Sequence, residues 1–295
     1  MTRVALIGAG MWGPRLAAAA ERAGLELVDA IEDADGALIA TPNHVHAENA
    51  IACAAAGKHV FVEKPIADTV EAAERMRSAC AEAGVLLMVG HGFRRLGAAR
   101  RAKELIGELG TVVLAEANFS LPGKLPPHAW RAQRTRNPGG PIMQLGIHHV
   151  DTLAYLLGPV ARTTGRFARV HTEAEIDDVG VVTLEFASGA LGVLTGSYVS
   201  PHTFSLRVLG SAGVLDYRAD LGAVWPDATR VDEVSTLTLN GEPVAFEPRD
   251  MLAEELAEFG AAIRGEAVVE TGADEGIAAL RVVLDAVGAR EELVR

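Results

Sequence analysis

A glycine-rich turn near the start of the chain has the residue types and spacing of a phosphate-binding site. Arg3–Gly8 is a short apolar run typical of a buried strand, and it leads into Gly8-Ala9-Gly10-Met11-Trp12-Gly13, which has the form G-x-G-x-x-G. Gly8 would allow a tight turn, Gly10 would let a pyrophosphate approach the backbone, and Gly13 would let the next helix pack on the strand. The N-terminus of that helix offers free N–H groups to phosphate. The motif therefore predicts dinucleotide binding.

An acidic residue is expected about 20 residues after such a motif, at the end of the second strand, where it holds the ribose hydroxyl of NAD. Asp29 follows the apolar residues Leu25–Val28 at roughly this spacing, and Glu32, Asp33 and Asp35 surround it. Because negative charges would repel a 2′-phosphate, the segment favours NAD over NADP.

The segment that follows this acid is too short for an ordinary crossover. Gly36–Thr41 is typical of a strand, and only Asp29–Asp35 would join it to a strand at residues 25–28. A parallel crossover needs roughly a dozen residues or more. Alternatively, residues 25–34 form a short helix with one apolar face, which would carry Leu27, Val28, Ile31 and Ala34. We favour the helix, which predicts that a strand–helix–strand unit is absent and that the grip on adenosine is weakened.

Beyond this segment, strands and helices alternate as in an open parallel sheet. Helices are predicted over residues 47–56 and 70–83, and strands over 59–62 and 85–90. Two loops with polar side chains follow strands at their C-terminal ends, where open α/β sheets bind ligands. These loops are Thr41-Pro42-Asn43-His44-Val45-His46 and Glu63-Lys64-Pro65.

Several blocks of the sequence resemble the Gfo/Idh/MocA family of NAD(P)-dependent oxidoreductases, and they occur in order through nearly the whole chain. The blocks are Thr41-Pro42-Asn43-x-x-His46, Gly57-Lys58-His59-Val60, Glu63-Lys64-Pro65, Val89-Gly90-His91-x-Phe93-Arg94, Trp130-Arg131 and the G-x-H-x-x-D block within Gly139–Asp151. The resemblance implies an N-terminal Rossmann domain, here residues 1–117. It also implies a C-terminal α+β domain, residues 118–295, with a large, open, mostly antiparallel sheet. Family members often pair through this sheet, so a homo-oligomer, a dimer or tetramer, is expected.

The second half of the sequence agrees with that architecture on its own pattern. Strands are predicted over residues 111–119, 166–170, 179–186, 190–199 and 204–209. Ser188-Gly189 is typical of a hairpin turn. Helices are predicted over 251–264 and 275–287 from apolar residues at helical spacing.

The resemblance also assigns roles to single residues. Lys64 would hydrogen-bond the substrate hydroxyl, and His148 would accept its proton while hydride passes to the nicotinamide. Gln144, Arg94 and Arg131 would contact the substrate. Gln144 departs from the family, because many relatives carry aspartate there. Glutamine forms hydrogen bonds but cannot ionise, so the substitution implies an altered substrate choice or pH optimum, or a loss of turnover. The residues implied to bind cofactor are Gly8, Gly10, Met11, Trp12, Gly13, Thr41, Pro42, Asn43, His46, Glu63 and Lys64.

Other classes of site have little support in the sequence. His44, His46 and His148 invite a metal site, but no cysteine or carboxylate completes a ligand set at recognised spacing. The net charge of −12 argues against nucleic-acid binding. No run of residues has the length and apolarity of a membrane helix, and the N-terminus lacks the layout of a signal peptide. The two cysteines, Cys53 and Cys80, are expected to be buried thiols, which suits the cytoplasm.

Three functions remain. The leading hypothesis is an oxidoreductase that moves a hydride between a nicotinamide cofactor and a sugar, polyol or related hydroxy or keto compound. A second is an NAD-assisted glycosidase, which would retain its cofactor without net NADH production. A third is a non-catalytic ligand sensor or assembly protein, favoured by the shortened first domain and by Gln144 but opposed by the intact glycine turn.

Overall fold

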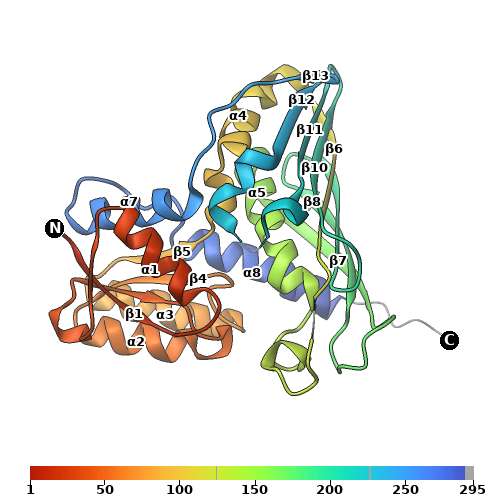
Figure 1. Ribbon diagram of the computed structural model, residues 1–295. Helices are drawn as coiled ribbons and strands as arrows, with labels where there is room; N and C mark the ends of the chain where they lie inside the picture. The colour runs from red at the N-terminus through yellow and green to blue at the C-terminus, as the bar shows by residue number, and fades with distance from the viewer. Residues whose placement is uncertain (124, 226, 290–295) are drawn as a thin grey trace. The chain divides into compact units, whose positions relative to one another are not determined.

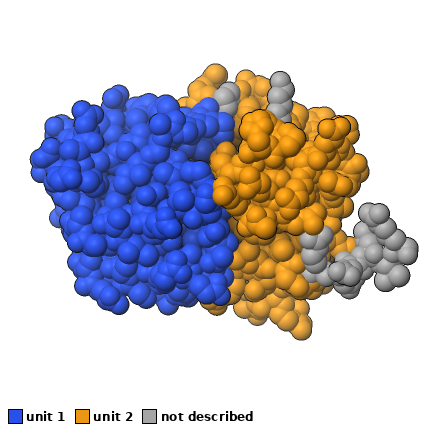
Figure 2. Space-filling view, turned by 90° about the horizontal axis from the view of Figure 1, so that it is seen from below, with its two compact units in different colours: residues 1–92, 250–280 blue, residues 93–249, 281–295 orange. Residues whose placement is uncertain are grey.

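The computed structural model describes residues 1–123, 125–225 and 227–289. The chain forms two units, one of residues 1–92 with 250–280 and one of residues 93–249 with 281 onward, which Figure 2 colours separately. The domain boundary predicted after residue 117 falls inside a strand of the second unit, β6 (Val112–Ser120). Within the described residues, no helix combines the length and the apolarity that crossing a membrane requires.

The first unit is built on a parallel sheet of five strands (Figure 1). In spatial order they are β2 (Glu26–Val28), β1 (Arg3–Ile7), β3 (Gly36–Ile39), β4 (His59–Glu63) and β5 (Leu87–Gly90). Every residue of β3 and β5 is buried, as expected for strands covered on both faces. The helices of this unit include α1 (Gly13–Arg22), α2 (His46–Ala55), α3 (Val70–Glu82) and α7 (Met251–Ile263). This is the doubly wound architecture that the first half of the sequence predicts.

The prediction of a helix over residues 25–34 is wrong. Residues Glu26–Val28 form β2, which pairs in parallel with β1, and only Ile31–Asp33 is helical, as a single 3₁₀ turn η1. The connection between β2 and β3 can be shorter than the dozen residues of an ordinary crossover because these strands lie on opposite sides of β1. Val28 pairs with Ala5 and Gly36 with Val4, so the connection needs only the turn η1 and returns only a short way along β1.

The first sheet is nevertheless shortened. A complete dinucleotide-binding sheet has six strands in the order 3-2-1-4-5-6. In the part of the first unit that the structure describes, no strand lies beyond β2. The missing piece is therefore smaller than predicted: the second strand is retained as three residues, and the outer strand and its helical connections are absent from the described residues.

The second unit contains an open sheet of eight strands. Their order is β13 (Glu242–Pro243), β12 (Ser235–Leu239), β11 (Val214–Ala219), β10 (Thr203–Gly210), β6, β9 (Leu191–Ser197), β8 (Val179–Phe186) and β7 (Val160–Ala168). All neighbouring strands are antiparallel except β6 and β9. This confirms the predicted large, mostly antiparallel sheet.

Helices cover one face of this second sheet (Figure 1). They include α4 (Gly97–Leu105), α5 (Ile147–Leu157) and the π-helical turn η6 (Ile142–Gly146) that precedes α5. On β8 and β9 buried residues alternate with more exposed ones, so the opposite face of these strands is open. Shorter elements are η2 (Asn43–Val45), η3 (Gly92–Arg95), η4 (Ile106–Leu109), η5 (Trp130–Ala132), α6 (Leu221–Val224) and η7 (Ala228–Val234), and α8 (Ala273–Gly288) ends the described chain.

Candidate functional site

The glycines of the β1–α1 turn differ in what surrounds them. Gly8 has a φ of 117°, and a Cβ there would lie 2.7 Å from the backbone of Ala40. A Cβ on Gly13 would lie 2.2 Å from the carbonyl oxygen of Gly8, whereas a Cβ on Gly10 would meet nothing within 4 Å. Gly8 and Gly13 are thus required by close backbone packing, and Gly10 faces open space. The turn fits a bound pyrophosphate, which would approach at Gly10.

The start of α1 is favourable to an anion. Pro14 occupies its first turn, and no acidic residue lies there. The guanidinium of Arg15 folds back on the turn: it donates to the carbonyl oxygen of Met11, and its carbon lies 5.4 Å from the centre of the Trp12 ring. The helix dipole and this cation both favour a phosphate at the turn.

The loop after β3 contains a buried amide with unsatisfied hydrogen-bonding atoms. Asn43 is 2% exposed, and neither its Nδ2 nor its Oδ1 has a hydrogen-bond partner among the residues that the structure describes. An unsatisfied buried polar group costs about 1–3 kcal/mol, so such a group suits a position where a ligand completes the bonding. Because the backbone of Ala40 and Thr41 abuts Gly8, this loop adjoins the glycine turn.

His46 ties this loop to the loop after β4. Its Nε2 lies 2.8 Å from the carbonyl oxygen of Thr41, and its Nδ1 lies 3.0 Å from that of Pro65. Burial lowers the pKa of His46, while the surrounding carbonyls and Asp68 act to raise it. Sequence reasoning places His46 at the cofactor; in the structure its ring lies between the backbone carbonyl oxygens of the two loops, and the neutral ring donates to one of them, so the side chain positions these loops.

The Glu63-Lys64-Pro65 loop places a carboxyl group and an ammonium group side by side in sequence at the end of β4. Glu63 is buried, and burial raises its pKa to about 7, although the charge of Lys64 acts to lower it. Lys64 is partly exposed and is followed by a cis peptide bond to Pro65.

In the second unit, His148 lies near the start of α5 against an aromatic cluster. Its ring centre is 4.3 Å from that of Phe93 and 5.8 Å from that of Phe119, and only 7% of the residue is exposed. The neighbouring His149 points elsewhere: it contacts Phe204, its Nε2 donates to the Asn118 carbonyl oxygen, and burial lowers its pKa to about 4.

Gln144 lies in the π-helical turn before α5. Its Nε2 donates to Asn137 Oδ1 at 3.1 Å, and Asn137 Nδ2 donates to the carbonyl oxygen of Arg131 at 2.9 Å. The turn packs closely on the sheet because two paired positions are glycine: a Cβ on Gly180 would lie 2.5 Å from the Ile142 side chain, and one on Gly196 would lie 3.2 Å from it. π-helical turns are frequent at functional sites.

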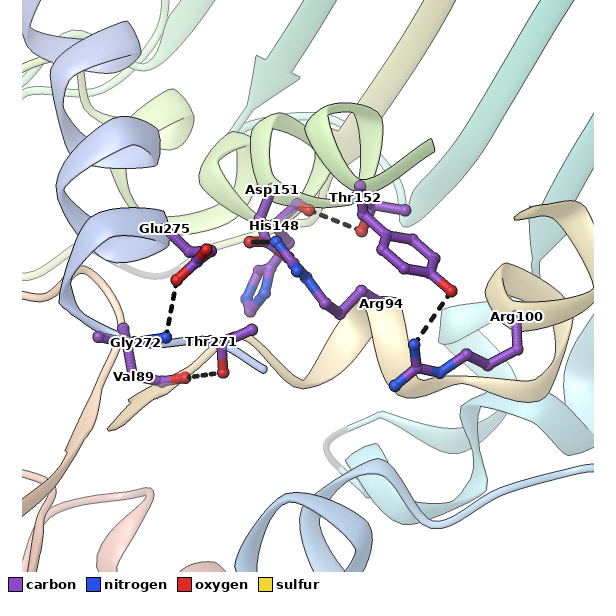
Figure 3. A network of polar contacts seen from close by, with 10 residues as sticks. Val89, Arg94, Arg100, His148, Asp151, Thr152, Thr271, Gly272 and Glu275 are labelled. Carbon is purple, nitrogen blue, oxygen red and sulfur yellow. Dashed lines mark hydrogen bonds and ion pairs between the residues drawn. The ribbon is translucent and has the colours of Figure 1, made fainter. Parts of the chain in front are cut away.

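Arg94 and Asp151 form a buried ion pair next to His148 (Figure 3). Arg94 Nε and Nη2 donate to the two carboxylate oxygens at 2.8 and 2.5 Å, and the side chains are 8% and 2% exposed. The guanidinium also lies 5.3 Å from the ring centre of Tyr155, one turn further along α5. Arg94 is a predicted substrate contact, and this geometry favours anchoring of α5 instead.

Arg131 is different from the other arginines of its loop. Its guanidinium stacks on Trp130 at 4.4 Å, and burial lowers its pKa. Arg134 pairs with Asp177 at 3.1 Å, whereas Arg131 forms no ion pair with any residue that the structure describes. A partly buried cation of this kind suits a polar or anionic ligand group.

Sequence reasoning missed two side chains that surround the predicted residues. Phe93 packs on His148, and Asn137 holds Gln144. Phe93 could have been found because it belongs to the block Gly90-His91-x-Phe93-Arg94, but no pattern singles out Asn137. Among the described residues, no group of three or more histidine, cysteine or carboxylate side chains is arranged to hold a metal ion.

Comparisons with known proteins match both halves of the chain. Residues 17–91 match the NAD-binding Rossmann fold of an oxidoreductase family, and residues 99–216 match the GFO/IDH/MocA C-terminal domain. The chain is 28% identical over 265 residues to the 1,5-anhydro-D-fructose reductase of Ensifer adhaerens, covering 87% of this chain and 78% of that protein.

Solved structures share the whole fold. One from Desulfitobacterium hafniense DCB-2, described as an NADPH-dependent oxidoreductase, has a TM-score of 0.89 and 34% identity, covering 98% of this chain and 95% of that one. The WlbA dehydrogenase of Bordetella pertussis, in complex with NADH and UDP-GlcNAcA, has a TM-score of 0.79 and 26% identity, covering 97% and 95%. With both domains matched and the fold shared from end to end, this chain belongs to the Gfo/Idh/MocA family of oxidoreductases.

Proposed function

We propose that this oxidoreductase transfers a hydride between NAD and a carbon that bears the hydroxyl or carbonyl group of a sugar, polyol or related compound. The observation that carries the proposal is the pairing of an open glycine position, Gly10, with the unsatisfied buried amide of Asn43 on the adjoining loop. A relative named for anhydrofructose, and a similar dehydrogenase solved in complex with UDP-GlcNAcA, support the substrate class.

The proposed roles follow the family pattern. A bound nicotinamide supplies the hydride acceptor or donor. Lys64 hydrogen-bonds the substrate hydroxyl, and His148 takes the hydroxyl proton on its imidazole, which suits a group with an ordinary pKa near 6.5. Gln144 and Arg131 contact the substrate, whereas Arg94, predicted as a third contact, acts on the site indirectly by anchoring α5 through Asp151. The cofactor is held by Gly8, Gly10, Met11, Trp12, Gly13, Thr41, Pro42, Asn43, Glu63 and Lys64. His46, predicted with them, acts by positioning the loops that carry Thr41 and Pro65.

The preference for NAD over NADP rests on Asp29. This residue follows β2 directly and is exposed, so its charge would repel a 2′-phosphate. Asp35 is close to Asp29 in sequence, but it accepts a hydrogen bond from the backbone nitrogen of Arg3. This places Asp35 at the N-terminal ends of β1 and β3, away from the end of the sheet where ligands bind. Asp29, which lies directly at the carboxyl end of β2, is therefore the acid expected at the ribose.

The first test is a titration of the purified protein with NADH and with NADPH, followed by calorimetry or nicotinamide fluorescence. We expect micromolar binding of NADH and weaker binding of NADPH, with Asp29→Ser narrowing the difference. A screen of sugars and polyols then identifies the substrate, on which Lys64→Met and His148→Ala should lower kcat by about 10²-fold or more. Failure to bind either cofactor at millimolar concentration would contradict the proposal.

Two broader features belong to the same proposal. The open face of the second sheet carries apolar side chains on adjacent strands, namely Leu114, Val181, Leu191 and Val193. We propose that this face joins copies of the chain into a dimer or tetramer. Cys53 and Cys80 are free and buried, which supports a cytoplasmic location.

A further inference from the structure

The half of the first sheet that normally holds the adenosine side of a dinucleotide is incomplete. A full dinucleotide-binding domain has two mononucleotide-binding halves, and the acid of the first half holds the adenosine ribose. Here that half consists of β1 and the three-residue strand β2, with no strand beyond β2 in the described part of the unit. The other half, β3, β4 and β5, is complete.

The segment that replaces the missing elements turns away from the ligand end of the sheet. Lys58 Nζ, just before β4, donates to the carbonyl oxygens of Glu32 and Ala34 at 2.9 and 2.8 Å. The backbone nitrogen of His59 donates to the carbonyl oxygen of Asp35 at 3.1 Å. These bonds hold the segment at the N-terminal ends of the strands, whereas open sheets bind ligands at the carboxyl ends.

Asp29 and Ala30 directly follow the end of β2, and both are exposed. Asp29 can bond a ribose hydroxyl, but Ala30 presents one methyl group, with no ring to stack on a base and no side-chain donor or acceptor. Within the described residues of this unit, the outer strand and helices that would form the β2 side of a slot for the adenine ring are therefore missing.

We infer that this chain contacts a nicotinamide dinucleotide as far as the adenosine ribose and makes no base-specific contact with the adenine. It therefore accepts dinucleotides with other bases in place of adenine. The inference rests on the proposed nicotinamide function. A base slot adds affinity by removing apolar ring surface from water and by bonding the polar edge of the ring. Where no slot exists, the edge stays hydrated in both free and bound states, and its identity does not affect binding.

The test compares the reduced adenine, hypoxanthine and cytosine nicotinamide dinucleotides by calorimetry on the full chain. We expect the three dissociation constants to agree within about fivefold, which is about 1 kcal/mol. A cytosine dinucleotide that binds more than fivefold more weakly than NADH would overturn the inference while leaving the nicotinamide function standing. Absence of binding by all three, NADH included, would overturn the proposed function and the inference together.

Gly10→Val is the matched control. A Cβ at Gly10 meets nothing within 4 Å, so the variant should fold as the wild type does, which thermal unfolding checks. Its side chain enters the space where the pyrophosphate is expected, so all three dinucleotides should weaken by a common factor of about tenfold or more. If the loss of affinity caused by Gly10→Val depends on the base, the chain makes base-specific contacts and the inference is wrong.

Discussion

Gln144 is the residue whose chemistry departs most from the family pattern. It is buried one helical turn before His148, and its amide donates to Asn137. An aspartate there would place a negative charge near the imidazole and raise its pKa, whereas the amide cannot. The neutral side chain therefore leaves the basicity of His148 to its other surroundings, among them the rings of Phe93 and Phe119.

Replacing Gln144 with aspartate should change the pH dependence of turnover. In Gln144→Asp we expect the apparent pKa of the catalytic base, read from kcat/KM against pH, to rise by about 1 unit or more. The neutral variant Gln144→Asn is the control and should keep the wild-type profile. An aspartate variant with an unchanged profile and substrate range would show that this position does not act on His148.

Glu63 should make stability depend on pH. Burial raises its pKa to about 7 from 4.5. Between these values the folded chain holds a proton that the unfolded chain has lost, so the free energy of unfolding falls as pH rises through this window. Glu63→Gln should flatten this slope and add on the order of 1–3 kcal/mol at pH 8 relative to wild type.

Urea unfolding at pH 5 and pH 8 measures this effect. The exposed Glu21, on α1, provides the control, because Glu21→Gln should leave the pH slope of the wild type in place. Equal slopes in wild type and Glu63→Gln would mean that Glu63 titrates at its ordinary pKa in the folded chain.

At the scale of elements, α5 is held in place by contacts at both ends. The π-helical turn at its start rests on Gly180 and Gly196, and the Arg94–Asp151 pair fixes its first turns (Figure 3). Near its end, Lys103 Nζ donates to the carbonyl oxygens of Tyr155 and Leu156 at 2.7 and 3.1 Å, which is favourable at a helix C-terminus. The helix that carries His148 is thereby fixed to α4.

Removing one partner of the Arg94–Asp151 ion pair should lower the free energy of unfolding more than replacing both partners with apolar residues. Arg94→Met removes the guanidinium that bonds both carboxylate oxygens of the buried Asp151, so we expect the free energy of unfolding to fall by about 3–5 kcal/mol. In the double variant Arg94→Met/Asp151→Leu, which removes both charges, most of this loss should be recovered. Denaturant unfolding measures the free energy of unfolding of both variants. A double variant as unstable as Arg94→Met would show that lost packing, and not the broken ion pair, causes the loss of stability.

At the scale of the whole molecule, the open sheet face leaves apolar surface on adjacent strands. Val181 and Leu191 are 41% and 56% exposed, and each lies on the face opposite the helices. Burying such a face between two copies would stabilise both through the hydrophobic effect.

Charges on this face should separate the copies. We expect light scattering to give the wild-type chain a mass of two or four copies, and Val181→Asp/Leu191→Asp a mass of one, with an unchanged circular dichroism spectrum. The exposed Val268 lies outside this sheet, and Val268→Asp should leave the oligomer intact. A wild-type chain that is already monomeric would contradict the proposed interface.

The sequence alone determined the parts of the protein that depend on short stretches of chain. The glycine turn and the loops after β3 and β4 follow from local strand–loop–helix patterns, and parallel strands bring their carboxyl ends to one edge of the sheet. The predicted loops therefore lie at the ligand end. Five strands of the second sheet follow from short apolar and β-branched runs, whereas β11, β12 and β13 are not predicted.

Only the tertiary structure decided the features that join distant residues. Residues 25–34 suit both helix and strand by pattern, and the choice fell to backbone hydrogen bonds with β1. Arg94 meets a carboxylate 57 residues away, and Thr271 bonds the carbonyl oxygen of Val89 across 182 residues, which joins residues 250–280 to the first unit. Such pairings depend on where the folded backbone places each group, because buried polar atoms take whichever partner the packing brings within reach.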